Sequence, residues 1–158
     1  MASARSDFSR HVRVSLRKQK IMRLFQARIS SLERGLVEIS AVNRPDLEQQ
    51  DGHVHAGALV TLADSAGGYA ALSLLPSGSR VLSVEVKLNF LRPSVGSMIR
   101  GRGRVQEIGR TIAVCELGDD ETGREMGHVR MGKPNNLLHT ARHDKLTSPT
   151  MSGRARII

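Results

Sequence analysis

One carboxylate stands at the centre of the most apolar stretch of the sequence, HVHAGALVTLADSAGGYAALSLL, which covers residues 53–75. This residue is Asp64, and burying it without a hydrogen bond or an opposite charge has a high desolvation cost. No cation shares its helical face, because the positions three and four residues away hold Val60, Thr61, Gly67 and Gly68. Asp64 is therefore a candidate for chemistry; a structural carboxylate that accepts hydrogen bonds from a neighbouring strand is the alternative.

Histidine and cysteine offer little further chemistry. His53 and His55 are separated by one residue and have no third ligand nearby in the sequence, so we expect no metal site. Cys115 is the one cysteine, which excludes an intramolecular disulfide and favours a reducing compartment such as the cytoplasm. We expect Cys115 to be a small core residue.

The elements that must position Asp64 follow from the hydrophobic pattern. Residues 53–75 predict a long helix that is apolar on every side, so a second surface, such as another subunit, should cover what one sheet leaves. The run VLSVEVKLNFL alternates and predicts a strand with Val84, Val86 and Leu88 on a buried face and Ser83 on the other. The runs MIRGRGRVQEI, RTIAVCEL and REMGHVRM predict three more strands that continue it as an antiparallel meander.

Two segments precede the long helix. A break at Glu33-Arg34-Gly35 predicts a hairpin within ARISSLERGLVEISAV. Residues 1–24 predict an amphipathic helix that packs on the core, with Ser6 as its N-cap and an apolar face that comprises Phe8, Val12, Leu16, Met22 and, just beyond, Phe25. Because this segment is rich in Arg and poor in acids, a mitochondrial transit peptide stays open as an alternative.

The chain therefore predicts a single α+β domain, in which an antiparallel sheet wraps around one long central helix. The domain should cover residues 25–133, with the N-terminal helix packed on it. Residues 134–158 have little periodicity and few large apolar side chains, so we expect a basic, mobile tail.

The net charge of +9 sits at the two ends of the chain. Residues 1–24 contribute +6 and residues 134–158 contribute +3, whereas residues 25–133 hold thirteen charges of each sign. With three Phe and one Tyr available to stack on bases, we expect no nucleic-acid partner. Asp64 interrupts the longest apolar run, which falls short of a charge-free span of about 20 residues, so we expect no membrane insertion.

The stretches HAGALVTLADSAGGYAA, LSVEVKLNFLRP and GRGRVQEIGRT resemble the hotdog-fold acyl-CoA thioesterases of the phenylacetyl-CoA, or PaaI-like, type. The resemblance runs from about Arg17 to Lys133, and its most specific element is a turn at His55 placed nine residues before Asp64. It implies a hotdog fold and hydrolysis of acyl-CoA with no metal or redox cofactor. A hotdog module that binds acyl-CoA or an acyl carrier partner without catalysis is the alternative.

The resemblance also implies roles for single residues. Asp64 would act as general base or nucleophile, and backbone N–H groups of the turn at His55, Ala56 and Gly57 would bind the thioester oxygen, as the positive end of a helix favours. Ala56 stands where the family has a glycine, which leaves the N–H but adds a methyl group. Gln50, or its neighbour Gln49, would orient the water, and Ser83 would assist Asp64.

The resemblance finally implies residues that contact the substrate. The candidates for binding the substrate or its CoA group are Asn89, Arg92, Arg100, Arg102 and Arg110. Arg100, Arg102 and Arg104 alternate along one strand face, where they could meet CoA phosphates or simply face water. In the family, two subunits set their long helices side by side, so we expect a homodimer or a homotetramer of dimers. His55 and Asp64 of one helix are about 13 Å apart, too far to grip one thioester carbon, which fits a site shared by two chains.

Overall fold

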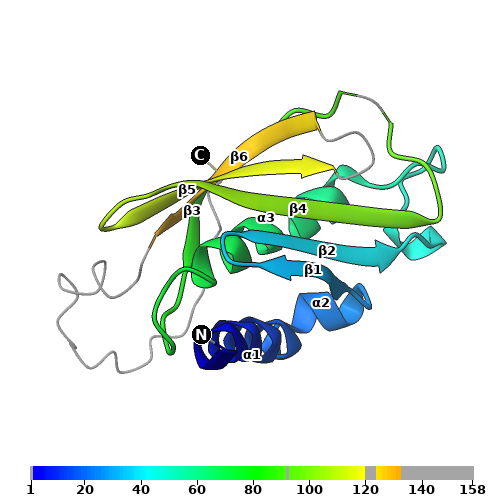
Figure 1. The fold of residues 1–158 in the computed structure, drawn as a ribbon. Helices are drawn as coiled ribbons and strands as arrows, with labels where there is room; N and C mark the ends of the chain where they lie inside the picture. Colours follow the sequence, from blue (N-terminus) through cyan, green and yellow to red (C-terminus); the bar gives the residue numbers. More distant parts are fainter. Residues whose placement is uncertain (1, 92, 120–123, 133–158) are drawn as a thin grey trace, which may run out of the picture.

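The computed structural model describes residues 2–91, 93–119 and 124–132. Three α-helices, one 3-10 helix and six strands make up this part of the chain (Figure 1). In chain order they are α1 (Ala2–Lys18), α2 (Lys20–Leu24), β1 (Arg28–Glu33), β2 (Leu36–Val42), η1 (Pro45–Leu47), α3 (Ala56–Leu72), β3 (Leu82–Leu88), β4 (Met98–Ile108), β5 (Ile112–Asp119) and β6 (Arg124–Gly132). The predicted tail over residues 134–158 lies outside the described residues.

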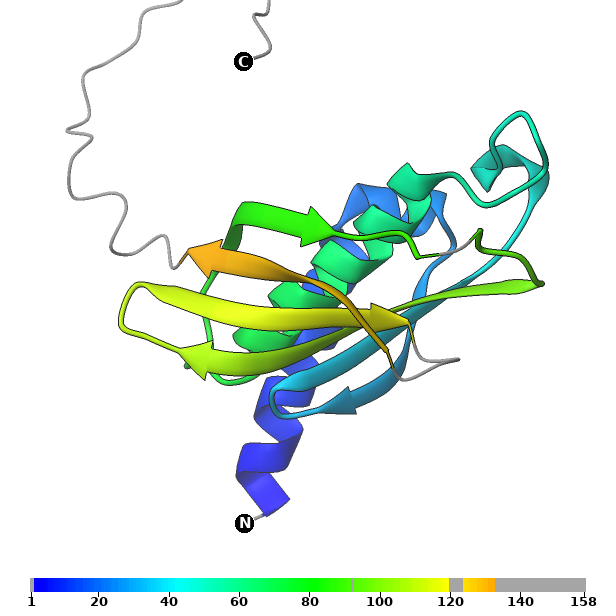
Figure 2. The same ribbon diagram turned by 90° about the horizontal axis from the view of Figure 1, so that it is seen from above.

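The six strands form one antiparallel sheet with the order β1-β2-β4-β5-β6-β3 (Figure 2). The long helix α3 packs on one face of this sheet, which confirms the predicted α+β layout with a central helix. Glycines on β4 allow the close approach: a Cβ on Gly101 would lie 2.6 Å from the backbone N of Ala63, and one on Gly103 would lie 2.5 Å from the carbonyl carbon of Ala66. Gly67 fits as tightly from the helix side, since its Cβ would lie 2.5 Å from Val129.

The N-terminal segment is helical, as predicted, but differs in detail. The prediction that Ser6 caps the helix is wrong, because α1 begins at Ala2 and Ser6 lies within it. The helix breaks at Gln19, whose backbone is extended (φ −76°, ψ 107°), and α2 follows directly. The turn between the two helices lets Val12 of α1 and Met22 of α2 both reach the core.

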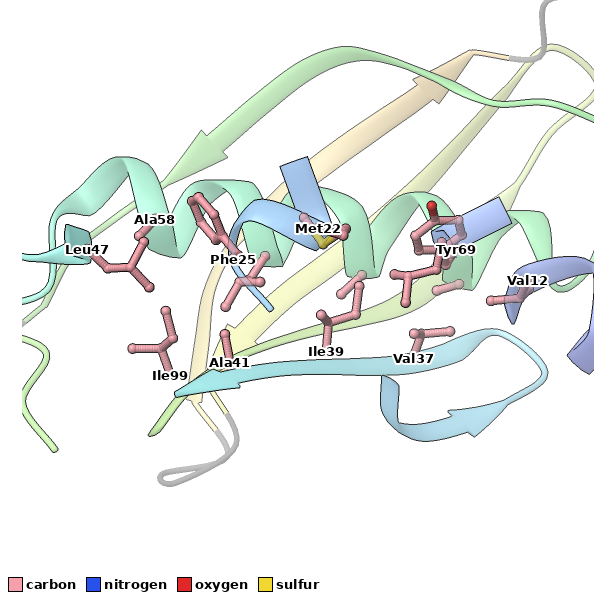
Figure 3. Packing of buried hydrophobic residues seen from close by; sticks show 14 of the residues in the cluster. Val12, Met22, Phe25, Val37, Ile39, Ala41, Leu47, Ala58, Tyr69 and Ile99 are labelled. Carbon is pink, nitrogen blue, oxygen red and sulfur yellow. The ribbon is translucent and has the colours of Figure 1, made fainter. Parts of the chain in front are cut away.

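The main core lies between α3, β2 and the two N-terminal helices (Figure 3). Val37 and Ile39 of β2 face α3, and Met22 and Phe25 close the space from the side of α2. A second cluster, formed by α3 with β5 and β6, contains Cys115, which is fully buried as expected. Because α1 and α2 cover part of α3, the chain itself supplies some of the second surface that the sequence requires.

Strand β3 is where the structure departs most from the prediction. The meander continues only through β4, β5 and β6; β3 pairs with β6 and forms the edge of the sheet. Its predicted buried face is covered only in part in the single chain: Leu88 packs against the second cluster, whereas Leu82 is 60 % exposed and Val84 is 57 % exposed. Exposed apolar side chains continue beyond the strand at Phe90 and Leu91. No helix within the described residues combines the length and apolar composition that crossing a membrane requires.

Candidate functional site

Asp64 lies half-buried near the middle of α3, and its partner comes from the edge strand, as the desolvation argument requires. The Ser83 hydroxyl donates to Oδ1 of Asp64 over 2.5 Å, and the same hydroxyl lies 3.6 Å from the sulfur of Met131. The other carboxylate oxygen, Oδ2, has no hydrogen-bond partner among the described residues. The structure therefore brings together the carboxylate and the strand hydroxyl that were predicted to act together.

A β-bulge aims Ser83 at Asp64. The pairing of β3 with β6 shifts between Ser83 and Glu85, so that Ser83 lies opposite Met131 and Glu85 lies opposite Arg130. Met131 is buried on the inner face, whereas Arg130 forms an exposed salt bridge of 3.0 Å with Glu85. The extra residue at the bulge reverses the alternation and turns Ser83 inward, a role that bulges often have near functional sites. Simple alternation had placed Ser83 on the outer face.

A groove of about 800 Å³ extends from Asp64 along the C-terminal half of α3. One wall comes from α1, and the other comes from residues 78–83 and β6. Its apolar lining consists of Val14, Leu72, Val81, Leu82 and Met131. The groove joins the proposed reacting carboxylate to an apolar surface, which suits an acyl group.

The floor of the groove contains a polar network that sequence reasoning missed. The hydroxyls of Tyr69 and Ser65 both donate to Oε1 of Gln19, over 3.2 and 3.4 Å. Burial raises the pKa of Tyr69, and a hydrogen bond with Ser15 of α1 partly opposes that rise. The sequence does indicate part of this network, because Ser65 and Tyr69 are four residues apart and therefore share a helix face beside Asp64.

The turn before α3 forms a capped helix N-terminus. Nδ1 of His55 accepts from the N–H of Gly57 over 2.9 Å, and the His55 carbonyl accepts from Ala58 over 2.9 Å. The His55 N–H in turn donates to the carbonyl of Leu47 over 2.8 Å, which holds the turn against the preceding loop. In the described part of the chain, the N–H of Ala56 donates to no acceptor. Ala56 thus offers the free amide of this turn, while His55 occupies that of Gly57.

The structure does not bring every predicted site residue together. The turn at His55 and the carboxylate of Asp64 are about 13 Å apart along α3, from the rise of a helix. Gln50 is exposed in the loop before the helix, where its amide donates to Asp51 over 3.3 Å, and it does not line the groove. The Gln49 side chain accepts from the backbone N–H of Asp51.

The predicted CoA-binding residues within the described part of the chain do not line the groove that contains Asp64. Arg100 and Arg102 alternate with Gly101 and Gly103, which face α3, so these arginines lie on the outer face of the sheet. Asn89, just after β3, and Arg110, between β4 and β5, are exposed. Arg92 lies outside the described residues.

Neither histidine near the turn belongs to a metal-type cluster. Over residues 2–91, 93–119 and 124–132, no three His, Cys, Asp or Glu side chains gather closely enough to hold a metal ion.

Comparisons with known proteins place this chain in a family. The thioesterase superfamily profile matches residues 51–118, a range that contains the turn, Asp64 and Ser83. A thioesterase family protein from Silicibacter pomeroyi has a similar structure, with 38 % sequence identity and a TM-score of 0.67, over 80 % of this chain and 94 % of that chain.

Two further relatives agree. The proofreading thioesterase EntH of Klebsiella pneumoniae subsp. pneumoniae is 30 % identical over 102 residues, which is 64 % of this chain and 74 % of that protein. The E. coli PaaI protein, from the phenylacetic acid degradation operon, has the same fold at 18 % identity, with a TM-score of 0.67 over 81 % of this chain and 92 % of that one. The chain therefore belongs to the thioesterase superfamily and is a thioester hydrolase with the hotdog fold.

Proposed function

We propose that the protein is an acyl-CoA thioesterase, which hydrolyses an acyl-CoA to the free acid and CoA. The observation that carries this proposal is the Asp64 carboxylate, held at one oxygen by Ser83 and placed where an acyl-sized groove begins. Membership of the thioesterase superfamily supports the reaction class. The reaction as proposed needs no metal or redox cofactor, since a carboxylate, water and amide donors suffice for it.

In the proposed mechanism, Asp64 acts from its second oxygen while Ser83 holds the first. As a general base, Oδ2 takes a proton from water, and the water oxygen attacks the thioester carbonyl carbon. As a nucleophile, Oδ2 attacks that carbon itself and forms an anhydride, which water then hydrolyses. In both routes the carbon–sulfur bond breaks, the CoA sulfur leaves with its electron pair and takes up a proton, and the acid is released.

The negative charge that forms on the thioester oxygen needs a donor. We assign this role first to the N–H of Ala56, which is free and lies at the positive end of α3. The N–H of Gly57 can join only if the imidazole of His55 gives up the hydrogen bond that it accepts now. The methyl group of Ala56 leaves this amide donor in place.

A second copy of the chain would complete the site. Asp64 and Ala56 of one chain are too far apart to act on one carbon, but two α3 helices that run antiparallel would bring each turn to the other chain's Asp64. Two surfaces fit such a partner: the exposed apolar side chains of the edge strand β3, and the incompletely buried stripe of α3 that contains Val60, Thr61 and Asp64. We therefore propose a homodimer, which could pair further into a tetramer.

Hydrolysis of a panel of acyl-CoAs tests the proposal. Free thiol should appear with the wild-type protein, and Asp64→Asn should lower kcat by at least about 100-fold, because the nearly isosteric amide cannot act as a base. Circular dichroism should show that the variant remains folded. Asp46→Asn, which changes an exposed carboxylate in a surface ion pair, is the matched control and should keep full activity. Undiminished turnover in Asp64→Asn would refute the assigned role.

A further inference from the structure

The N-terminal helices contribute a polar group to the wall of the groove. Gln19 lies at the break between α1 and α2, and its extended backbone lets the half-buried side chain reach α3. Gln19 contacts Ser65, the residue next to Asp64, as well as Tyr69. This element lies outside residues 51–118, the range that the superfamily profile matches. The groove is therefore shaped partly by a segment that lies outside the profile match.

The hydrogen bonds fix which way the Gln19 amide points. The phenolic O–H of Tyr69 donates to Oε1 of Gln19 over 3.2 Å. Ser65 donates to the same oxygen, which leaves Oε1 fully used and Nε2 as the free end of the amide. Nε2 of Gln19 donates to no acceptor in the described part of the chain.

A second nitrogen on this wall has no partner within the described residues and, unlike Nε2 of Gln19, it is buried. Nε2 of His11, further along α1 in the same groove, is buried without a hydrogen-bond partner within the described residues. Unpaired buried polar groups are rare, so each one needs an explanation, and a group that binds in the adjoining groove would supply one. The lining combines these polar groups with apolar residues, Val14 and Leu72 among them, and it also includes the cations Lys18 and Arg80. The groove is thus complementary to a mainly apolar chain that carries an oxygen.

We propose that Gln19 determines specificity for the acyl group: its Nε2 donates to an oxygen that the acyl group carries beyond the thioester, so acyl groups with such an oxygen bind better than plain alkyl chains of equal length. This inference rests on the proposed function, in which Asp64 marks the thioester end of the groove. Ser65 and Tyr69, which hold Gln19, are one and five residues beyond Asp64, or about 1.5 and 7.5 Å along the helix axis. That span suits an oxygen on a short or medium acyl chain.

Binding to an inactive protein tests the inference without turnover. The Asp64→Asn variant is titrated with hexanoyl-CoA, 3-oxohexanoyl-CoA and 5-oxohexanoyl-CoA by calorimetry, so that chain length stays constant while a carbonyl oxygen moves along it. At least one oxo ester should bind about five- to tenfold more tightly than hexanoyl-CoA, the range that one net hydrogen bond supplies. Equal affinity of all three esters would overturn the inference.

Two substitutions of Gln19 identify the donor. Gln19→Glu, added to Asp64→Asn, keeps an acceptor for Tyr69 and Ser65 but removes the Nε2 donor, and Gln19→Leu removes both functions without adding a charge. In each, the preference for the oxo ester should fall to less than about twofold. Arg17→Gln, on the exposed side of α1 and outside the groove, is the matched control and should leave the preference unchanged. If both Gln19 variants still prefer the oxo ester to hexanoyl-CoA, the oxygen is bound by another residue and the inference is wrong.

Failure of the proposed catalytic function can be distinguished from failure of the specificity inference. If wild-type protein hydrolysed none of the three esters, the catalytic proposal would be wrong, but the ratio of their dissociation constants could still be measured. That ratio, with and without Gln19, decides the specificity inference by itself. If Gln19 instead contacted the CoA group, its substitution would lower the binding affinity for all three esters equally. This result would contradict the inference.

Discussion

At the scale of residues, the proposed mechanism depends on the hydrogen bond that the Ser83 hydroxyl donates to Asp64. A hydroxyl that donates to one carboxylate oxygen restricts rotation of the Asp64 side chain. The second oxygen is then left in a fixed position towards the groove. Ser83 is a positioning residue in this scheme, because it acts through Asp64 and has no assigned contact with the substrate.

Removing the hydroxyl should therefore affect turnover more than binding. Ser83→Ala should lower kcat about 10- to 100-fold with little change in KM, since a hydrogen bond to a charged group contributes about 1.5–3 kcal/mol. Ser83→Thr retains a hydroxyl and should recover much of the loss. Steady-state kinetics of the two variants, with thermal melting as the check on folding, measures both effects. A kcat for Ser83→Ala equal to that of wild type would show that the hydrogen bond has no catalytic role.

The sequence predicts these residues unequally. Asp64 stands out because a lone carboxylate in an apolar helix demands a partner from elsewhere, and the structure supplies that partner from β3. The inward direction of Ser83 was not predictable from alternation, because it depends on a bulge in the pairing with β6. Gln19 was missed because its role depends on contacts with Ser65 and Tyr69, about 50 residues further along the chain.

At the scale of elements, the contact between α3 and β4 positions the site. Side chains on β4 would hold the two backbones apart, so glycines occupy the positions that face the helix. Gly103 has the closest contacts, with the backbone of Ala66 and Gly67. Because these contacts are with backbone rather than with flexible side chains, the helix cannot accommodate a methyl group there without moving.

Substitution at this contact should be costly. Gly103→Ala should lower the free energy of unfolding by at least about 2 kcal/mol, because overpacking against a backbone forces β4 and α3 apart. The matched control is Arg104→Ala, one residue further on the exposed outer face, which should change stability by less than about 1 kcal/mol. Urea denaturation of both variants gives the comparison. Equal stability of Gly103→Ala and wild type would contradict the close packing.

Local sequence patterns predict which helices and strands form better than they predict which strands lie side by side in the sheet. The hairpin of β1 and β2, the long helix and the last three strands each have a clear period or turn signal, and all of them form. The position of β3 beside β6 depends on pairing between strands that are far apart in the sequence, which no local pattern encodes. The exposed apolar face of β3 has the same origin: the alternation correctly indicates a face that needs covering, but the single chain covers it only in part.

At the scale of the whole molecule, the central claim is that two chains share each site. The free amide at Ala56 and the carboxylate of Asp64 lie about 12 Å apart along one helix, and the edge strand beside Asp64 exposes apolar side chains. An isologous dimer with antiparallel α3 helices would answer both observations, because it covers the strand and creates two identical sites.

Complementation between two inactive variants tests this claim most directly. Asp64→Asn removes the carboxylate, and Ala56→Pro removes the free amide at the first position of α3, where proline is well tolerated and the extended backbone of His55 suits a following proline. Each variant should be nearly inactive alone, while Ala56→Gly, which retains the N–H, should be active. A mixed dimer would hold one site with both lesions and one site with neither.

The measurement is the hydrolysis rate after equal amounts of the two variants are unfolded and refolded together. Both must first be shown to fold and to self-associate when purified alone, by circular dichroism and size-exclusion chromatography. With random pairing about half of the dimers are mixed, so the account predicts recovery of about a quarter of wild-type activity. A rate no higher than the sum of the two separate variants would contradict it and would show that Asp64 does not act with the turn of a partner chain.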